Sequence, residues 1–233
     1  MLTGIDVSSW QGNINVRYMP VDFVIAKATE DVDYVNPYCD FVVQQCIESG
    51  KKWGFYHFAK GADPEAEARY FVDNTCNYFG RGIPVLDFEG EAAYIWGVLG
   101  AKAFLDAVYR ETGIKPLIYM SESVCSALDW SSVANSDYGL WVAKYPNVMH
   151  PTFEDVASAG AGLDTGAWPF AAIWQFASDC RVAGYDGDLD GNVAFMDVAA
   201  WDAYAGACAN ADSGTLETAN FENEKIKVSV TFK

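Results

Sequence analysis

Ile83-Pro84-Val85-Leu86-Asp87-Phe88-Glu89-Gly90 is an apolar segment that ends in two acids. The short run of Ile, Val and Leu before a glycine predicts a buried strand. Residues i and i+2 of a strand point to the same face, about 6–7 Å apart, so the Asp87 and Glu89 side chains are expected to project together. Two carboxyl groups held together can titrate differently, one keeping its proton at neutral pH while the other is ionised, as glycoside hydrolysis requires. The simpler alternative is that both acids only cap the strand and the helix that follows.

Similar apolar strands alternate with helical patterns along most of the chain. The other predicted strands are residues 2–7, 23–28, 53–59, 117–120, 140–143 and 171–176, with a short eighth strand near residues 188–193. Helical patterns occupy residues 38–49, 64–78, 96–112 and 121–128, and Asp63-Pro64 supplies the cap and first turn of the second. This alternation in a chain of 233 residues predicts an α/β fold, a single irregular parallel (β/α) barrel of the TIM type.

Every predicted strand ends in a polar or aromatic residue. These residues are Asp6, Lys27, Tyr56 with His57, Asp87 with Glu89, Tyr119, Trp141 with Lys144, and Gln175. In a β/α barrel the site forms at the C-terminal ends of the strands, so we expect this set to line a cleft. His57 follows Tyr56 directly and therefore points to the opposite face of its strand, which favours a structural role.

The charge and the aromatic content of the chain indicate which kinds of molecule it can bind. The formal net charge is −17, which argues against binding nucleic acid or an anionic membrane. A neutral glycan remains a natural partner, because the 8 Trp, 13 Tyr and 14 Phe include rings on which sugars can stack. No apolar run of about 18 residues is present, so no membrane insertion is expected.

Several of these segments together carry a resemblance. They are Gly4-Ile5-Asp6-Val7-Ser8-Ser9-Trp10-Gln11-Gly12, Gly54-Phe55-Tyr56-His57-Phe58, Pro84-Val85-Leu86-Asp87-Phe88-Glu89 and Ile173-Trp174-Gln175-Phe176. In this order they resemble the successive motifs of glycoside hydrolase family 25, the Chalaropsis-type muramidases, over residues 1–207. The family includes phage endolysins and bacterial autolysins.

The resemblance implies hydrolysis of the β-1,4 bond between N-acetylmuramic acid and N-acetylglucosamine in peptidoglycan, with retention and without a cofactor. It implies that Glu89 is the general acid, Asp87 its partner, and Asp6 and a late aspartate the rest of the catalytic set. Tyr56, Tyr119, Trp141 and Gln175 would contact the sugar. The nucleophile is either the substrate's own 2-acetamido oxygen or a carboxylate, since both need the same two acids.

The late aspartate lies in Asp188-Leu189-Asp190-Gly191-Asn192. Asp190 fits the family pattern best, because an asparagine follows two residues later, and Asp188 is the alternative. The same stretch, from Asp186 to Asp197, also has the spacing of a calcium loop. We predict no metal, because a strand rather than a helix precedes it.

The chain changes character after residue 208. Residues 209–221 have a linker composition, and residues 222–233 alternate apolar and polar side chains as a strand with one apolar face. A lone strand cannot bury that face, so it is expected to pair with the barrel, with another copy of the chain, or with a further module. Residues 1–208 are then the catalytic barrel.

Alternatives of other classes are a barrel hydrolase acting on chitin or another N-acetylated glycan, and a glycan-binding barrel without activity. The presence of Asp6, Asp87 and Glu89 argues against the latter. The expected place of action is the bacterial cell wall. Because Met1–Val7 shows no signal peptide, we expect phage-type release from the cytoplasm or export by another route.

Overall fold

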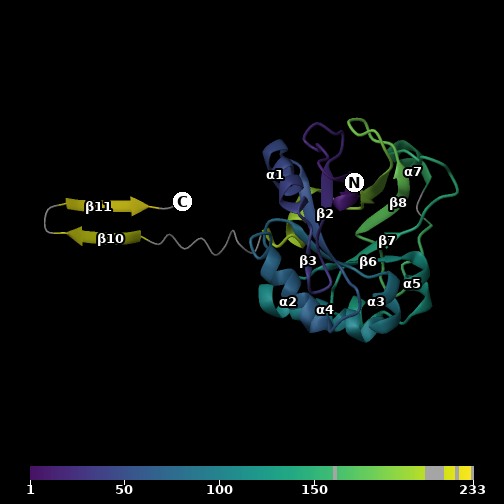
Figure 1. The fold of residues 1–233 in the computed structure, drawn as a ribbon, viewed down its shortest axis with the longest axis horizontal. Helices are drawn as coiled ribbons and strands as arrows, with labels where there is room; N and C mark the ends of the chain where they lie inside the picture. Colours follow the sequence, from purple (N-terminus) through teal and green to yellow (C-terminus); the bar gives the residue numbers. More distant parts are fainter. Residues whose placement is uncertain (160–161, 208–217, 224–225, 232–233) are drawn as a thin grey trace.

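The structure of the chain is a computed structural model, which describes residues 1–159, 162–207, 218–223 and 226–231. At its centre is a closed barrel of parallel and antiparallel strands (Figure 1). The strands pair in the order β1-β9-β8-β7-β6-β5-β4-β2, and β1 pairs with β2 to close the barrel. Their bounds are β1 Leu2–Val7, β2 Phe23–Glu30, β4 Lys52–Phe58, β5 Ile83–Asp87, β6 Leu117–Ser121, β7 Leu140–Ala143, β8 Ile173–Cys180 and β9 Leu189–Ala194. The predicted TIM-like α/β barrel is confirmed.

One strand departs from the fully parallel barrel that the alternation predicts. β9 runs antiparallel to both of its neighbours, β1 and β8. The reason is the short link between β8 and β9: a parallel pair needs a crossover of a dozen or more residues, usually a helix, whereas an antiparallel pair does not. The short strand β3 (Tyr34–Val35), which pairs antiparallel with the end of β2, was not predicted.

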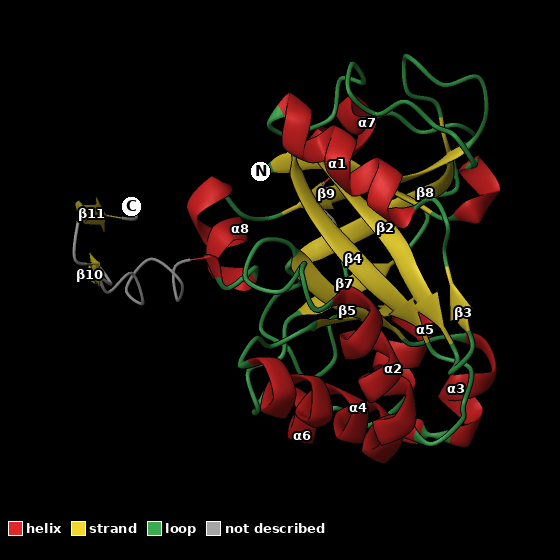
Figure 2. Cartoon of the chain, turned by 60° about the vertical axis from the view of Figure 1, so that its left-hand side comes forward, coloured by secondary structure: helices red, strands yellow, loops and turns green. Residues whose placement is uncertain are grey.

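Helices cover the outer face of the barrel (Figure 2). α2 (Pro64–Thr75) begins as predicted, with the Asp63 carboxylate accepting a hydrogen bond from the amide of Ala66. The predicted helices also include α1 (Cys39–Ser49), α4 (Gly97–Thr112) and α5 (Glu122–Ala127). The remaining helical elements are short: η1 (Ser9–Gln11), α3 (Gly90–Ile95), α6 (Ser131–Ala134), α7 (Phe153–Ala159) and α8 (Val198–Tyr204).

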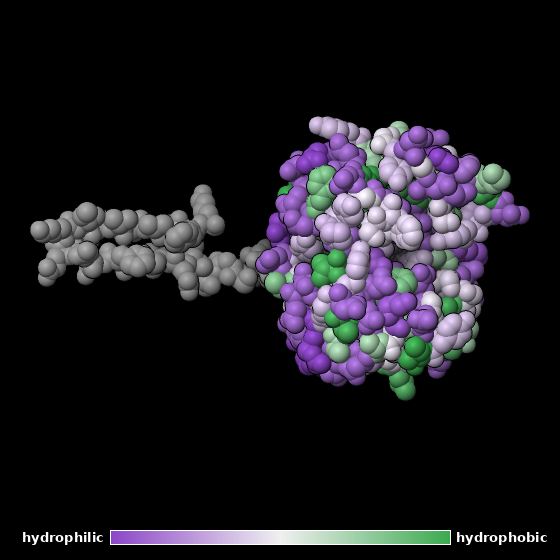
Figure 3. Space-filling view, viewed as in Figure 1, coloured by the Kyte–Doolittle hydropathy of each residue, from purple (hydrophilic) through white to green (hydrophobic). Residues whose placement is uncertain are grey.

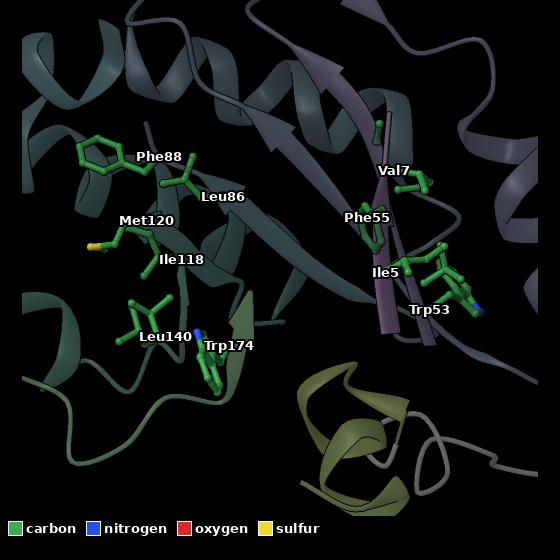
Figure 4. Close-up of a cluster of buried hydrophobic side chains, with 14 of the residues drawn as sticks. Ile5, Val7, Trp53, Phe55, Leu86, Phe88, Ile118, Met120, Leu140 and Trp174 are labelled. Atoms are coloured by element: carbon green, nitrogen blue, oxygen red, sulfur yellow. The ribbon is translucent and has the colours of Figure 1, made fainter. Parts of the chain in front are cut away.

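Alternation along the strands divides the core into two layers. Outward side chains pack with the helices, and Figure 4 shows Ile5, Phe55, Leu86, Ile118 and Trp174 among them. Inward side chains fill the half of the barrel at the N-terminal ends of the strands; they include Phe23, Ile25, Ile83, Val85, Leu117 and Ile173. Trp201 of α8 closes this end, with its ring centroid 4.7 Å from that of Phe23. The barrel interior is therefore apolar at one end and open to polar groups at the other.

The end of the chain forms a separate two-stranded sheet. β10 (Thr218–Asn223) and β11 (Ile226–Thr231) pair antiparallel with each other. β11 lies within the strand predicted at 222–233, and its partner β10 begins inside the predicted linker, 209–221. This pairing differs from the three partners that the sequence predicts. None of the helices in the described parts of the chain is long and apolar enough to cross a membrane.

Candidate active site

A polar cavity of about 270 Å³ opens at the C-terminal ends of the strands. Every residue expected in the catalytic or sugar-binding set lines it: Asp6, Tyr56, Asp87, Glu89, Tyr119, Trp141, Gln175 and Asp190. Ser8, Trp10, Lys27, Phe58 and Tyr145 complete its lining. The structure therefore brings together side chains from strands that are far apart in the sequence.

Asp6 and Asp190 form a carboxyl pair across two strands. They are directly opposite each other in the register of β1 and β9, and a hydrogen bond links their side chains. Burial, followed by the charge of Asp190, raises the pKa of Asp6 well above its usual value. Burial also raises the pKa of Asp190, to about 6. Burial is therefore the main cause of both shifts, and the hydrogen bond to Asp6 acts against the rise at Asp190.

Amide side chains fix the orientation of Asp6. Its Oδ2 accepts hydrogen bonds from Gln175 Nε2 at 2.8 Å and from Asn192 Nδ2 at 2.7 Å. Gln175 Oε1 in turn accepts from the hydroxyls of Tyr119 at 2.8 Å and Tyr145 at 2.7 Å. Burial raises the pKa of both tyrosines, so these hydroxyls stay protonated and donate. The floor of the cavity is thus a connected network that holds one carboxylate in place.

Two members of this network were not predicted. Asn192 is fully buried, and its Oδ1 accepts from Trp141 Nε1 at 2.9 Å. A signal for it existed, because Asn192 is two residues beyond Asp190 on the same strand and must face the same side. Tyr145 follows the end of β7 in a loop, where no periodicity indicates the direction of a side chain.

Asp87 and Glu89 project from the end of β5, as their spacing predicts. Asp87 is 8% exposed, and its Oδ1 has no hydrogen-bond partner among the described residues. Burial and the charge of Glu89 raise the pKa of Asp87 well above its usual value. Burial also raises the pKa of Glu89, against the opposing charge of Lys27. In both residues, burial favours the protonated form of the carboxyl group.

Lys27 is the cation among the residues that line the cavity. Its ammonium group pairs with Glu30 and lies 4.4 Å from the centroid of the Phe58 ring. Trp10, carried by η1, stands at the rim with 91% of its surface exposed. The motif that contains Trp10 was recognised in the sequence, but its place at the cavity was not.

Two polar residues at strand ends lie outside the cavity. His57 is fully buried on the outer face of β4, between Thr29 Oγ1 and Glu67 Oε2, each at 2.8 Å. Burial lowers the pKa of His57, so it is a neutral structural group, consistent with the expectation for it. Lys144 pairs with Glu122 at 2.8 Å. The rule that strand ends line the cleft therefore fails for Lys144.

The segment around the late aspartate is a strand. Asp190 lines the cavity, whereas Asp188 pairs with Arg181 at 2.9 Å and does not line it. Asp197, the last acid of the calcium-loop pattern, caps α8 by accepting a hydrogen bond from the amide of Ala200. Within the described residues, no group of three or more His, Cys, Asp or Glu side chains is placed to hold a metal ion.

Known proteins resemble this chain in sequence and in fold. Residues 5–185 match the family described as glycosyl hydrolases family 25. The N,O-diacetylmuramidase of Chalaropsis sp is 27% identical over 82% of this chain and 94% of its own length. Lysozyme M1 of Streptomyces globisporus is 31% identical over 81% of this chain and 66% of its own length.

A solved structure agrees with these relatives. The bacterial lysozyme from Streptomyces coelicolor superposes with a TM-score of 0.74 at 26% identity, over 88% of this chain and 97% of that one. The family match covers most of the barrel and includes Asp6, Asp87 and Glu89. The chain belongs to glycosyl hydrolases family 25.

Proposed function

We propose that this chain is an N-acetylmuramidase, which cleaves the β-1,4 bond between N-acetylmuramic acid and N-acetylglucosamine in peptidoglycan. The observation that carries the proposal is the cavity in which Asp6, Asp87, Glu89 and Asp190 converge, in a member of family 25. Relatives that are named muramidase and lysozyme support it. The place of action is the bacterial cell wall.

Glu89 is the general acid in this proposal. Burial raises the pKa of Glu89 and so favours its protonated form, and that proton passes to the glycosidic oxygen as the bond from C1 to this oxygen breaks. The charge of Lys27 lowers the pKa of Glu89 and so favours the carboxylate that remains after the proton has left.

Asp87 acts on the other side of the reacting carbon. Its unpartnered Oδ1 is an acceptor that an acetamide N–H of the substrate can occupy. This supports retention through the substrate's own acetamido oxygen, with Asp87 orienting and polarising the amide. Asp6 and Asp190, held by Gln175 and Asn192, complete the negative field that stabilises a developing oxocarbenium ion.

The test is the release of reducing ends from purified peptidoglycan by the wild-type chain and by Glu89→Gln, with mass spectrometry of the products. We expect products that end in N-acetylmuramic acid, and a loss of at least about 10²-fold in the variant. Glu91→Gln is the matched control, because Glu91 is exposed two residues away and pairs only weakly with Lys60 at 3.3 Å. Cleavage of chitin without cleavage of peptidoglycan would replace this proposal with the chitinase alternative.

A further inference from the structure

A buried carboxylate outside the cavity holds the link between β4 and α2, residues 59–62. Glu67 of α2 is fully buried. Its Oε1 accepts hydrogen bonds from the backbone amides of Gly61 at 2.9 Å and Ala62 at 2.7 Å, and its Oε2 accepts from that of Lys60 at 3.1 Å. Oε2 also accepts from His57 Nε2 at 2.8 Å. Four donors therefore satisfy one carboxylate, and three of them fix the course of the link.

The surroundings of this carboxylate set its charge and its orientation. Burial acts to raise the pKa of Glu67, but the hydrogen bonds from His57 and from the link hold it below its usual value, so Glu67 is ionised. Burial lowers the pKa of His57, so its ring is neutral. An ionised carboxylate only accepts, so the ring proton lies on Nε2, and Nδ1 accepts from the Thr29 hydroxyl at 2.8 Å. Side chains from β2 and β4 thus hold Glu67 in one orientation.

The other side of the link contacts both ends of the segment that carries Glu89. The amide of Ala59 donates to the carbonyl oxygen of Asp87 at 3.1 Å. The carbonyl oxygen of Ala62 accepts from Trp96 Nε1 at 2.6 Å. Glu89 and Trp96 are the N-terminal and C-terminal cap residues of α3, a helix of six residues. The link therefore bonds the chain just before the general acid and just after the helix that the acid begins.

Gly61 lets the link lie directly against α3. Its φ is 100°, which favours glycine, and a Cβ at this position would be 2.6 Å from Ile95 Cδ1. The contact leaves no room for a side chain, so a shift of the link toward the helix moves α3. The Glu89 side chain caps no amide of its own helix. Its place therefore depends on the backbone that carries it, in contrast to Asp6, which amide side chains hold.

We propose that Glu67 is a positioning residue for Glu89: through the link it sets the place of α3 and so the place of the general acid. The inference rests on the proposed function and adds to it a residue that does not touch the substrate. A general acid acts only within hydrogen-bond reach, about 2.6–3.2 Å, of the atom that it protonates. A displacement of about 1 Å that originates far from the chemistry can cost as much as about 10²-fold in rate.

The experiment compares two leaving groups. One substrate is a glycan strand of peptidoglycan from which the peptides have been removed, and its leaving sugar needs the proton of Glu89. The other is the glycosyl fluoride of the disaccharide unit, from which fluoride departs as a weak base that needs little protonation. Glu89→Gln sets the reference: it should lose at least about 10²-fold on strands and far less on the fluoride.

Glu67→Gln should show the same selectivity on a smaller scale. It keeps the size of the side chain but replaces an acceptor oxygen with a donor, so at least one amide of the link loses its partner. We expect kcat on strands to fall by about tenfold, with KM and the release of fluoride each within about twofold of wild type. A wild-type rate on strands would overturn the proposal. So would equal losses on both substrates, which are the mark of general damage to the fold.

A second pair of variants tests the link where it meets α3, and decides the question if Glu67→Gln does not fold. Trp96→Phe removes the donor to Ala62. Trp168→Phe is the matched control, because its indole N–H donates to the carbonyl oxygen of Tyr138 at 2.7 Å and its exposed fraction is 6%, against 8% for Trp96. We expect Trp96→Phe to lose several-fold on strands alone, and Trp168→Phe to act as wild type on both substrates.

Two outcomes of this second comparison separate the inference from the function on which it rests. If Trp96→Phe and Trp168→Phe behave alike on strands, the link does not position Glu89 and the proposal is overturned. A wild-type chain that cleaves neither the strand nor the fluoride would instead contradict the proposed function.

Discussion

At the scale of single residues, burial gives the acids of the cavity pKa values that free carboxyl groups do not have. Asp190 and Asp188 belong to the same short segment, yet burial raises the pKa of Asp190 to about 6, whereas Asp188 is half-exposed and pairs with Arg181. The difference follows from position along the chain, because Asp190 lies within β9, whereas Asp188 precedes that strand. One enters the barrel and the other pairs at the surface.

This difference predicts that Asp190→Asn stabilises the protein. The folded pKa of about 6 exceeds the ordinary value of 3.8, so between these values the folded state binds more protons than the unfolded state. The free energy of unfolding therefore falls as the pH rises through this window, and remains lower above it. At pH 7.5 we expect the free energy of unfolding of Asp190→Asn, measured by urea titration, to exceed that of wild type by about 1–3 kcal/mol. At pH 4 the gain should be small.

Activity should move in the opposite direction. Asp190→Asn is expected to lose at least about tenfold in activity while it gains stability, as is common where an active site stores unfavourable charge. Asp188→Asn is the control and should keep its activity, with stability unchanged or slightly lower because it loses a surface ion pair. A gain in stability that is equal at pH 4 and pH 7.5 would show that the titration of Asp190 is not the cause.

At the scale of the elements, the local sequence is sufficient to predict where the strands lie, but it is insufficient to predict whether they run parallel or antiparallel. The apolar run before Asp87 predicts a strand because buried strands must hide side chains on both faces. Nothing local in residues 188–193 distinguishes a parallel from an antiparallel strand, since direction depends on the length of the connection and on both neighbours. Short helices such as α3 and α6 have too few turns to show periodicity.

The same reasoning explains how much of the site could be predicted. Asp6 and Gln175 were predicted because each lies near the end of a predicted strand, and the barrel rule places strand ends in one cleft. Tyr145 comes from a loop and Trp10 from the three-residue helix η1, and in neither does period 2 or period 3.6 apply. The hydrogen bond from Gln175 to Asp6 joins residues 169 positions apart, so only the closed barrel brings them together.

The stability of the barrel is expected to depend on α8, because its Trp201 side chain closes the apolar end of the barrel. Trp201 is 1% exposed, and its indole N–H has no hydrogen-bond partner among the described residues. Trp201→Ala should cost about 3–5 kcal/mol of unfolding free energy in urea titrations, because it leaves a large cavity. Trp201→Phe should cost less than about 1.5 kcal/mol, because it keeps most of the ring volume and removes an unpaired donor.

Trp96 provides the comparison. Its indole N–H donates to the carbonyl oxygen of Ala62 at 2.6 Å, and the residue is 8% exposed. Trp96→Phe leaves that carbonyl without its donor and should therefore cost more than Trp201→Phe. The account of α8 would be wrong if Trp201→Phe destabilised the protein as much as Trp201→Ala.

At the scale of the whole molecule, negative charge dominates. The net charge of −17 is spread over a surface that is largely hydrophilic on the face shown in Figure 3. The carboxylates of the cavity add to this field, with Lys27 as the opposing charge in the lining. The peptide stems of peptidoglycan also carry carboxylates, so the enzyme and its polymeric substrate repel each other before the glycan reaches the cavity.

This repulsion predicts that salt accelerates the enzyme on intact peptidoglycan. Raising the ionic strength from 0.01 to 0.15 M shortens the screening length from about 30 to about 8 Å, which removes most long-range repulsion but little of the field inside the cavity. We expect the initial rate of solubilisation to rise several-fold over this range, through KM rather than kcat. The reference substrate is the glycosyl fluoride of the disaccharide unit of peptidoglycan, from which the enzyme releases a fluoride ion. The rate on this substrate should change by less than about twofold, because it lacks the peptide stems. If salt slowed both reactions equally, attraction at the cavity rather than repulsion at the surface would govern how the substrate approaches.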